Sequence, residues 1–256
     1  MIRKRKHQPF SKLSIKQKIK RILKILVGIV IFITLPTLLF FSFLYLKYNE
    51  PFPEAIESPK ADVLAQKMLE ALNFEAFKNT DYIEWTFKNS HSYKWYKSAD
   101  NCEVKWKGFR VILQLKDVNK SSVFVANQNY NGTDKQKLIN KAEAYFNNDF
   151  FWLAAPYKIF DKGTKRQLVK TEGNKEALLV TYISGGTTPG DSYLWHLDKS
   201  GKPIAYQMWV NILPIGGLKA TWDDWKVTQT GAILPKSHKL LFLNLEIKNI
   251  NTSEQP

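Results

Sequence analysis

The longest uninterrupted run of apolar positions lies close to the N-terminus. Residues 25–46 contain no charged side chain, and the few small or polar positions among them include Gly28 and Pro36. As a helix these residues would extend about 33 Å, close to the roughly 30 Å of hydrocarbon in a bilayer. A spanning helix also tolerates an internal proline better than a soluble helix does. The pattern predicts one transmembrane helix over residues 25–46.

The apolar pattern changes twice after this segment. Residues 47–59 contain Pro51, Pro53 and Pro59, which hold their neighbours extended, so this stretch is predicted to be a linker. Apolar side chains then recur at helical spacing from Leu64 to about residue 73. Ser58 followed by Pro59 is a typical helix start, which predicts an amphipathic helix docked on a core.

From Tyr82 onward the period becomes two. Apolar and polar residues alternate over residues 82–88, 93–95, 102–107 and 109–115, and a further strand is expected at 122–127. Short alternating segments with tight connections are typical of an antiparallel meander that has one buried face.

A helical segment separates this meander from a second one. Thr133 or Asp134 is the expected cap, Leu138 to Phe146 follow at helical spacing, and the segment continues into the apolar residues 150–156. Strands are then predicted at 166–170, 177–183, 193–197, 203–210 and 220–227, with two more between 234 and 248. Helix, meander, helical insert and meander predict an α+β fold with a large antiparallel sheet.

The charge distribution sets the expected topology. The net charge is +15, from 38 Lys and Arg against 23 Asp and Glu. Ten of the cations and none of the carboxylates lie within residues 1–24, which leaves 28 − 23 = +5 for the rest. Because cations are retained on the cytoplasmic side, residues 1–24 are predicted to be a basic cytoplasmic tail and the body to be extracytoplasmic.

The N-terminal region has other interpretations. A cleaved signal peptide is disfavoured because the apolar run is long and residues 43–48 offer no cleavage site of small residues. The segment 11–24 could lie on anionic headgroups as an amphipathic helix, or the tail could be a topology signal and nothing more. A nucleic-acid role for the tail is disfavoured because the basic cluster lies against the membrane and lacks a reading element, and one for the body because its charge is nearly balanced.

Few residues point to catalysis or to metal binding. Cys102 is the single cysteine, which excludes a disulfide framework, and its place on an apolar face predicts an inert thiol. His196 and Asp198 lie two apart, with His238 as a conceivable third ligand, but nothing in the sequence brings them together. His91 has no evident partner. The loop 184–191 lacks the ending of a phosphate loop and is expected to be structural. We therefore expect no catalytic residue, no metal site and no cofactor.

The order of elements over residues 60–250 resembles the outer-membrane lipoprotein carrier (LolA-like) superfamily. That resemblance implies a half-open barrel: a large curved antiparallel sheet that wraps a helical lid and holds an acyl chain. It also implies an extracytoplasmic domain at residues 60–250 and a tail at 251–256. A second similarity, to uncharacterised proteins of Bacteroidota, is found in residues 148–153 with Pro156, Lys158, Asp161 and Gly163, and again in Gly185-Gly186 through Pro189-Gly190-Asp191.

The remaining signal is aromatic, with 8 Trp, 11 Tyr and 16 Phe. Such rings can fill the interior of a barrel or line a cavity for a lipid tail. The predicted ligand-binding residues are Trp85, Trp95, Trp106, Phe150, Phe151, Trp152, Leu153 and Ile215.

The predicted function is non-catalytic binding of a hydrophobic ligand, such as an acyl chain or a lipoprotein. The expected place is the bacterial inner membrane, with one pass, a cytoplasmic N-terminus and a periplasmic C-terminal domain. The expected partners are the lipid bilayer and such ligands, without nucleic acid. The alternative is a structural or protein-interaction module of an envelope complex with no ligand cavity, and a hydrolase is a more distant one.

Overall fold

The computed structural model describes residues 15–184 and 188–255. The chain forms two compact units, residues 1–49 and residues 50–256, and each is described by itself. The predictions for the first fourteen residues of the basic tail, and for Gly185 and Gly186 in the loop, lie outside the described residues.

The first unit is one long helix, α1 (Ile15–Tyr48), of 34 residues or about 51 Å. It is longer than the predicted span, because the lysine-rich residues 15–24 continue the same helix. The hydroxyls of Thr34 and Thr37, on either side of Pro36, donate to the carbonyls of Val30 and Ile33 at 2.8 and 2.9 Å. Their polar groups are thus satisfied within the helix, as a lipid environment requires. By length and composition α1 could cross a membrane.

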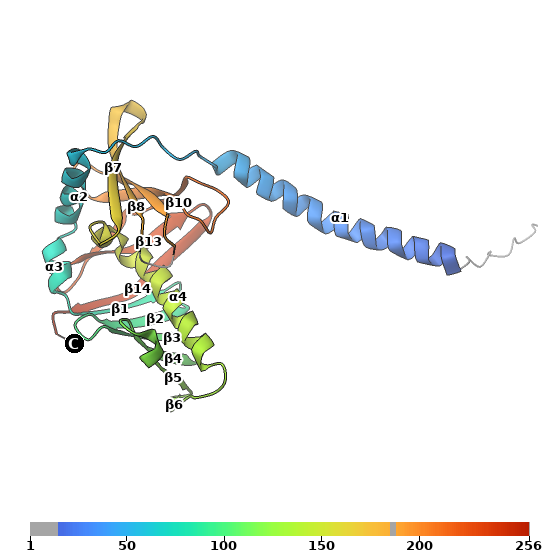
Figure 1. Ribbon diagram of the computed structural model, residues 1–256, viewed down its shortest axis with the longest axis horizontal. Helices are drawn as coiled ribbons and strands as arrows, with labels where there is room; N and C mark the ends of the chain where they lie inside the picture. Colours follow the sequence, from blue (N-terminus) through green and yellow to red (C-terminus); the bar gives the residue numbers. More distant parts are fainter. Residues whose placement is uncertain (1–14, 185–187, 256) are drawn as a thin grey trace, which may run out of the picture. The chain divides into compact units, whose positions relative to one another are not determined.

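The second unit is built on one antiparallel sheet of 14 strands that is curved but not closed. Figure 1 shows how its two halves meet at β1 and β14. The first half is β1 (Tyr82–Phe87), β2 (His91–Tyr96), β3 (Asn101–Trp106), β4 (Phe109–Gln114), β5 (Ser122–Val125) and β6 (Gln128–Asn129). The second half is β7 (Thr164–Thr171), β8 (Lys175–Tyr182), β9 (Ser192–Leu197), β10 (Pro203–Trp209), β11 (Leu218–Thr221), β12 (Asp224–Val227), β13 (Ile233–Leu240) and β14 (Leu243–Ser253).

The sheet order follows from the two predicted meanders. Strands β1 to β6 run outward in sequence to one edge, and β7 to β11 run inward from the other edge to meet β13. The pairing of β1 with β14 joins the first and last strands and makes the two meanders one sheet. The predicted fold class, α+β with a large curved antiparallel sheet preceded by one long apolar helix, is confirmed.

Two predicted boundaries near the C-terminus differ from the structure. The segment 220–227 is not one strand but two, β11 and β12, and both pair with β13. The break falls at Trp222, which is fully buried, with its ring centroid 5.0 Å from that of Trp195 and 4.3 Å from that of His238. The last strand continues to Ser253, beyond the predicted end of the domain at residue 250.

Two short helices precede the sheet. Ser58 caps α2 (Pro59–Ala71): its hydroxyl accepts from the backbone of Lys60 at 3.3 Å, and proline occupies the first turn, as predicted. The buried face of α2 packs on β7 and β8. Asn73, in a left-handed conformation with φ of 56°, leads into α3 (Phe74–Asn79).

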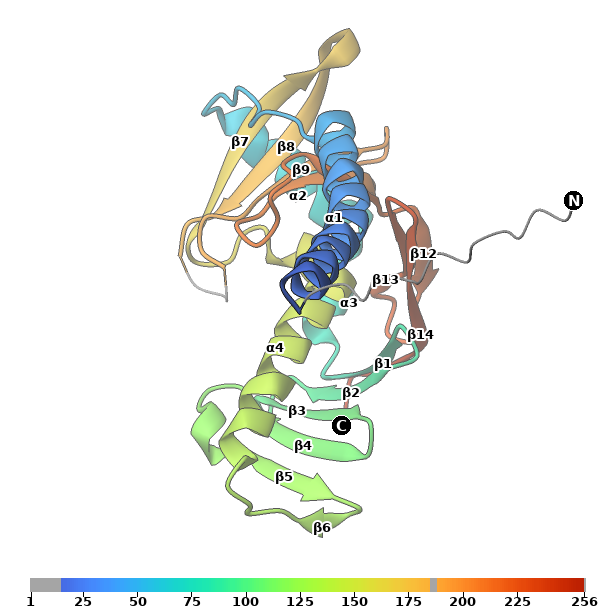
Figure 2. The ribbon, with the colours of Figure 1, turned by 90° about the vertical axis from the view of Figure 1, so that its right-hand side faces the viewer.

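The helix that matters most for the site is α4 (Lys135–Ala154). The predicted helix and the apolar residues that follow it form this one element, which ends in a 3-10 turn, η2 (Ala155–Lys158). Shorter 3-10 turns occur at η1 (Val118–Lys120) and η3 (Glu172–Asn174). Figure 2 shows α4 crossing one face of the sheet, where it contacts β3, β4, β5 and β13.

His238 on β13 fastens the C-terminal end of α4 to the sheet. The side chain is fully buried; Nε2 lies 2.7 Å from the carbonyl oxygen of Trp152, and Nδ1 lies 2.8 Å from that of Thr221. The Trp152 carbonyl belongs to the last turn of the helix, where carbonyls lack a helical partner. Burial lowers the pKa of His238 from 6.5 to about 4, although the two carbonyls favour the charged form.

This buried histidine predicts an acid-dependent loss of stability. Between pH 6.5 and pH 4 the unfolded chain binds a proton at residue 238 and the folded chain does not. The free energy of unfolding should therefore fall as the pH falls, by about 3 kcal/mol once the pH is below 4. Urea unfolding of the full chain at several pH values measures this slope. In His238→Gln the slope over this range should become much shallower, and an unchanged slope would contradict this assignment.

Candidate functional site

A pocket of about 190 Å³ lies where the C-terminal half of α4 meets the ends of β8 and β9. We call it the aromatic pocket. Its floor is Phe150, Phe151, Tyr182 and Tyr193. The polar residues around it are Asn147, Lys158, Asp161, Lys162, Ser184, Thr188 and Asp191.

The floor is a set of rings in contact. Phe150 and Phe151 are consecutive on α4, so their side chains diverge by about 100°. Phe151 faces the second half of the sheet, with its ring centroid 4.5 Å from that of Tyr193 and 6.1 Å from that of Tyr182. Phe150 faces the first half and meets Trp95 on β2 edge-on at 4.9 Å. The helix therefore joins the two halves of the sheet at this pocket.

The two tyrosines of the floor are neutral hydrogen-bonding groups. Burial raises the pKa of both Tyr182 and Tyr193, with smaller contributions from the carboxylates of Asp161 and Asp191 respectively. The hydroxyl oxygen of Tyr182 is buried and has no hydrogen-bond partner within residues 15–184 and 188–255. An unsatisfied buried hydroxyl is costly to the stability of the fold.

The rim of the pocket carries positively and negatively charged side chains. Lys158 forms an ion pair with Asp161, and its ammonium lies 5.7 Å from the ring centroid of Phe150. Asp191 is buried and accepts a hydrogen bond from the backbone of Asn211 at 2.9 Å. Lys162 is exposed at the mouth. The pocket thus combines an apolar floor with two lysines and two aspartates around its opening.

A buried carboxylate holds α4 in place beside the pocket. Asp149 is 1% exposed, and its Oδ2 accepts from the Tyr93 hydroxyl at 2.5 Å and lies 2.7 Å from Nδ1 of His91. Its Oδ1 accepts from the side chain of Asn148 at 2.8 Å. His91 also stacks on Tyr145, one turn earlier in α4, at 3.9 Å. The expectation that His91 lacks a partner is therefore wrong.

The other candidate residues have separate roles. His196 Nε2 lies 2.9 Å from the side-chain oxygen of Gln207, whereas Asp198 accepts hydrogen bonds from its own turn. His238 is held by the backbone of Trp152 and Thr221. Cys102 is fully buried, and burial raises the pKa of its thiol. Among the described residues no three His, Cys, Asp or Glu side chains are placed to hold a metal ion.

The predicted ligand-binding residues fall into four places. Phe150 and Phe151 line the aromatic pocket. Trp85, Trp95 and Trp106 lie on β1, β2 and β3. Trp85 packs with Tyr93, and Trp95 packs with Phe146 and Phe150. Trp106 packs with Phe109 and Tyr145. Trp152 and Leu153 are close to the end of α4. Trp152 contacts Tyr206 and His238, and Leu153 is fully buried. Ile215 lies on the β10–β11 loop.

Sequence reasoning did not assign Tyr182 or Tyr193 to a site. The signal that could have found the pocket is the pair of short runs that carry the Bacteroidota resemblance. Lys158 and Asp161 belong to the first run and Asp191 to the second, and all three line the aromatic pocket. The structure thus brings together two segments that are about 30 residues apart in the sequence.

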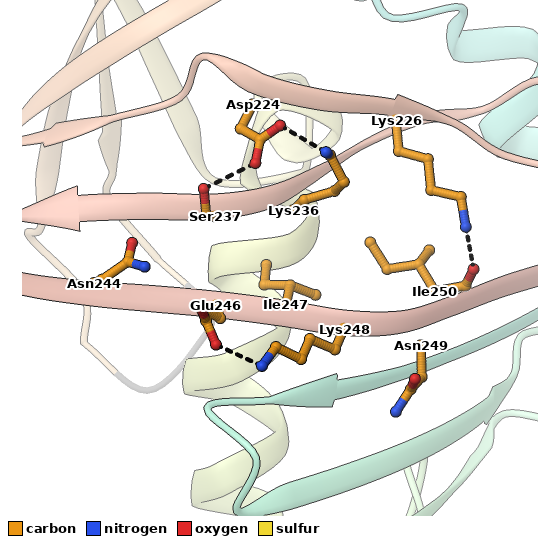
Figure 3. A pocket seen from close by; sticks show the side chains of 10 residues that line it. All are labelled: Asp224, Lys226, Lys236, Ser237, Asn244, Glu246, Ile247, Lys248, Asn249 and Ile250. Carbon is orange, nitrogen blue, oxygen red and sulfur yellow. Dashed lines mark hydrogen bonds and ion pairs between the residues drawn. The ribbon is translucent and has the colours of Figure 1, made fainter.

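A second hollow, a polar groove of about 600 Å³, lies along β12, β13 and β14. Figure 3 shows two ion pairs in this groove and a lysine, Lys226, that reaches a backbone carbonyl. Asp224 binds Lys236 at 2.9 Å, Glu246 binds Lys248 at 2.8 Å, and Lys226 donates to the backbone of Ile250 at 2.8 Å. Because the groove is lined mainly by charged and polar side chains, whereas four aromatic rings line the aromatic pocket, the aromatic pocket is the better candidate site for an apolar ligand.

The Asp149 network gives a prediction about stability. Asp149→Asn replaces a carboxylate that accepts from three donors with an amide, so charge-assisted hydrogen bonds are lost in a buried place. The free energy of unfolding, measured with urea on the full chain, should fall by about 2–3 kcal/mol. Asn148→Ala removes a single bond from an exposed side chain and should cost less than about 1 kcal/mol. Equal losses in the two variants would argue against this role for Asp149.

Comparisons with known proteins find a solved structure with a distant likeness. No protein-family model matches the sequence, and no curated protein matches it. A solved structure of a DUF1329 family protein from Desulfovibrio piger ATCC 29098 is similar over 75% of this chain and 93% of that chain, with 9% sequence identity and a TM-score of 0.41. At that level the likeness carries no argument about the site. The resemblances to LolA-like carriers and to Bacteroidota proteins stay predictions.

Proposed function

We propose that the body, residues 50–256, binds the apolar end of an amphiphilic ligand in the aromatic pocket, without catalysis. The observation that carries this proposal is the composition of the pocket: four aromatic rings form its floor, and lysines stand at its mouth. An acyl chain with an anionic head fits this combination.

The size of the pocket limits what it takes. A volume of about 190 Å³ holds about six groups the size of a water molecule or a methylene. Sites that enclose a drug-sized ligand measure about 300–1,000 Å³. The pocket therefore accepts the end of a chain while the remainder stays outside it. The pocket is therefore smaller than the interior of a barrel that encloses a complete acyl chain.

We further propose that α1 anchors the protein in a bacterial inner membrane with the body in the periplasm. The support is the length and apolar composition of α1 together with the ten cations before residue 25. An anchored body stays close to lipid, which is the source of amphiphiles with acyl chains. In this arrangement the bilayer is the principal partner, and lipoproteins are a further class of ligand.

One observation favours the alternative, a protein-interaction module without a ligand. Much of the interior is filled by large side chains such as Trp85, Trp195, Trp222 and Tyr206, all fully buried. A solid interior suits a rigid scaffold as well as it suits a binding protein. The two proposals differ in whether the aromatic pocket is occupied.

Quenching of tryptophan fluorescence separates them. All eight tryptophans lie in the body, and Trp95 contacts the pocket residue Phe150. Titrating 11-bromoundecanoate into the full chain in nanodiscs should therefore give saturable quenching. Asn147→Phe fills the mouth of the pocket and should weaken the apparent affinity at least about tenfold, a change of about 1.4 kcal/mol.

Asn140→Phe is the matched control, since Asn140 is exposed on the same helix two turns away from Asn147. Its apparent affinity should stay within about twofold of the unmodified chain, well below the tenfold steps of the affinity scale. Quenching that does not saturate, or that Asn147→Phe leaves unchanged, would count against ligand binding and in favour of the interaction module.

A further inference from the structure

Large apolar side chains are exposed on two loops of the body. Ile212 and Leu213 lie on the β10–β11 loop, Leu241 and Phe242 form the β13–β14 turn, and Leu243 begins β14. Ile212 is 74% exposed and Phe242 is 75% exposed. We call these five residues the apolar edge. Loops usually carry polar residues, so a cluster of this kind points to a contact surface.

The strand register places both loops at the same end of the sheet. Met208 pairs with Leu218 at the end of the β10–β11 hairpin, and Leu240 pairs with Leu243 at the end of the β13–β14 hairpin. Strands β11 and β13 pair with each other through Ala220 and Leu240. Because the pairing is antiparallel, Leu218 and the β13–β14 turn lie toward the same side. The two loops are therefore neighbours.

The start of the body is fixed to this same end. The backbone N–H of Glu50 donates to the carbonyl of Gly216 at 2.9 Å, and the indole of Trp209 donates to the carbonyl of Glu50 at 3.0 Å. A Cβ on Gly216 would lie 2.6 Å from the Trp209 ring and 3.0 Å from the Glu50 carbonyl oxygen. Gly217 has φ of +75° and no space for a side chain against Glu50. Both glycines are required for this contact.

Chain length connects this contact to the anchor. Glu50 follows the last residue of α1, Tyr48, by two positions. Two residues span at most about 7 Å. The point at which the chain leaves α1 is thus close to the loop that carries Ile212.

We infer that the apolar edge rests in the interfacial layer of the bilayer that α1 crosses, and so orients the body on the membrane. This rests on the proposal that α1 is an anchor. Residues 209–217 and 240–244 contain no charged side chain, while the exposed Lys219 and Lys239 flank them. Cations beside an apolar surface fit anionic headgroups.

The aromatic residues nearby support an interfacial depth. Phe52 is 54% exposed and contacts the ring of Trp209 edge-on at 5.6 Å. Aromatic rings of this kind favour the boundary between headgroups and acyl chains. The backbone of a loop cannot enter the hydrocarbon unpaired, so only the side-chain tips of Ile212 and Phe242 should reach it.

Depth-dependent quenching in vesicles tests the inference. Single-cysteine variants Ile212→Cys and Phe242→Cys are made in a Cys102→Ala background of the full chain and labelled with the environment-sensitive dye NBD. The labelled protein is reconstituted into vesicles of phosphatidylethanolamine and phosphatidylglycerol with doxyl-labelled lipid. We expect at least twofold quenching at both positions.

Val227→Cys is the matched control. Val227 is 67% exposed but pairs with Ile233, at the opposite end of β13 from Phe242, about 23 Å away along the strand. Phe32→Cys, inside α1, reports separately on the anchor. Quenching at residues 212 and 242 without quenching at 227 supports the inference. No quenching at 212 and 242, or equal quenching at 227, overturns the inference. No quenching at 32 shows that α1 does not cross the bilayer, which removes the proposal on which the inference rests.

Discussion

The body depends on the packing of α4 across the sheet. Fourteen strands at about 4.8 Å spacing would make a flat sheet about 60 Å wide, whereas α4, with 20 residues, is about 30 Å long. One helix cannot cover such a face. The sheet instead curves around α4, and aromatic side chains, which bury more area than aliphatic ones, fill the space that remains. This explains why so many of the buried side chains are rings.

Two polar contacts fix the helix in rotation and along its axis. Asp149 binds His91 and Tyr93 on β2, and the carbonyl of Trp152 binds His238 on β13. These contacts lie on either side of Phe150 and Phe151, the two residues that form the floor of the aromatic pocket. A helix held on both halves of the sheet keeps the two rings pointing in defined directions. The geometry of the pocket is therefore a consequence of buried hydrogen bonds that the ligand itself need not touch.

Local pattern predicted the elements well and their long-range pairing poorly. Alternation located β1 to β4 because each of these strands has one face on the core. The same reasoning merged β11 with β12, since Trp222 continues the alternation although the strand is interrupted between Thr221 and Asp224. His91 and Asp149 are 58 residues apart, and no local period connects them. A carboxylate three residues after Phe146 on an apolar helical face was a signal that a buried partner must exist.

The pocket was harder to predict for the same reason. Phe150 and Phe151 were identified by their apolar run, but Tyr182 and Tyr193 are ordinary alternating strand residues in the sequence. Only the pairing of β8 with β9, and the placement of α4 against their ends, brings the four rings together.

The most direct test of ligand binding in the aromatic pocket is a crystal structure of the full chain grown with 11-bromoundecanoate, with the bromine located by anomalous diffraction. If the aromatic pocket binds the end of an acyl chain, a bromine peak is expected among Phe150, Phe151, Tyr182 and Tyr193. A peak elsewhere on the body, or an aromatic pocket that holds only water, would contradict it.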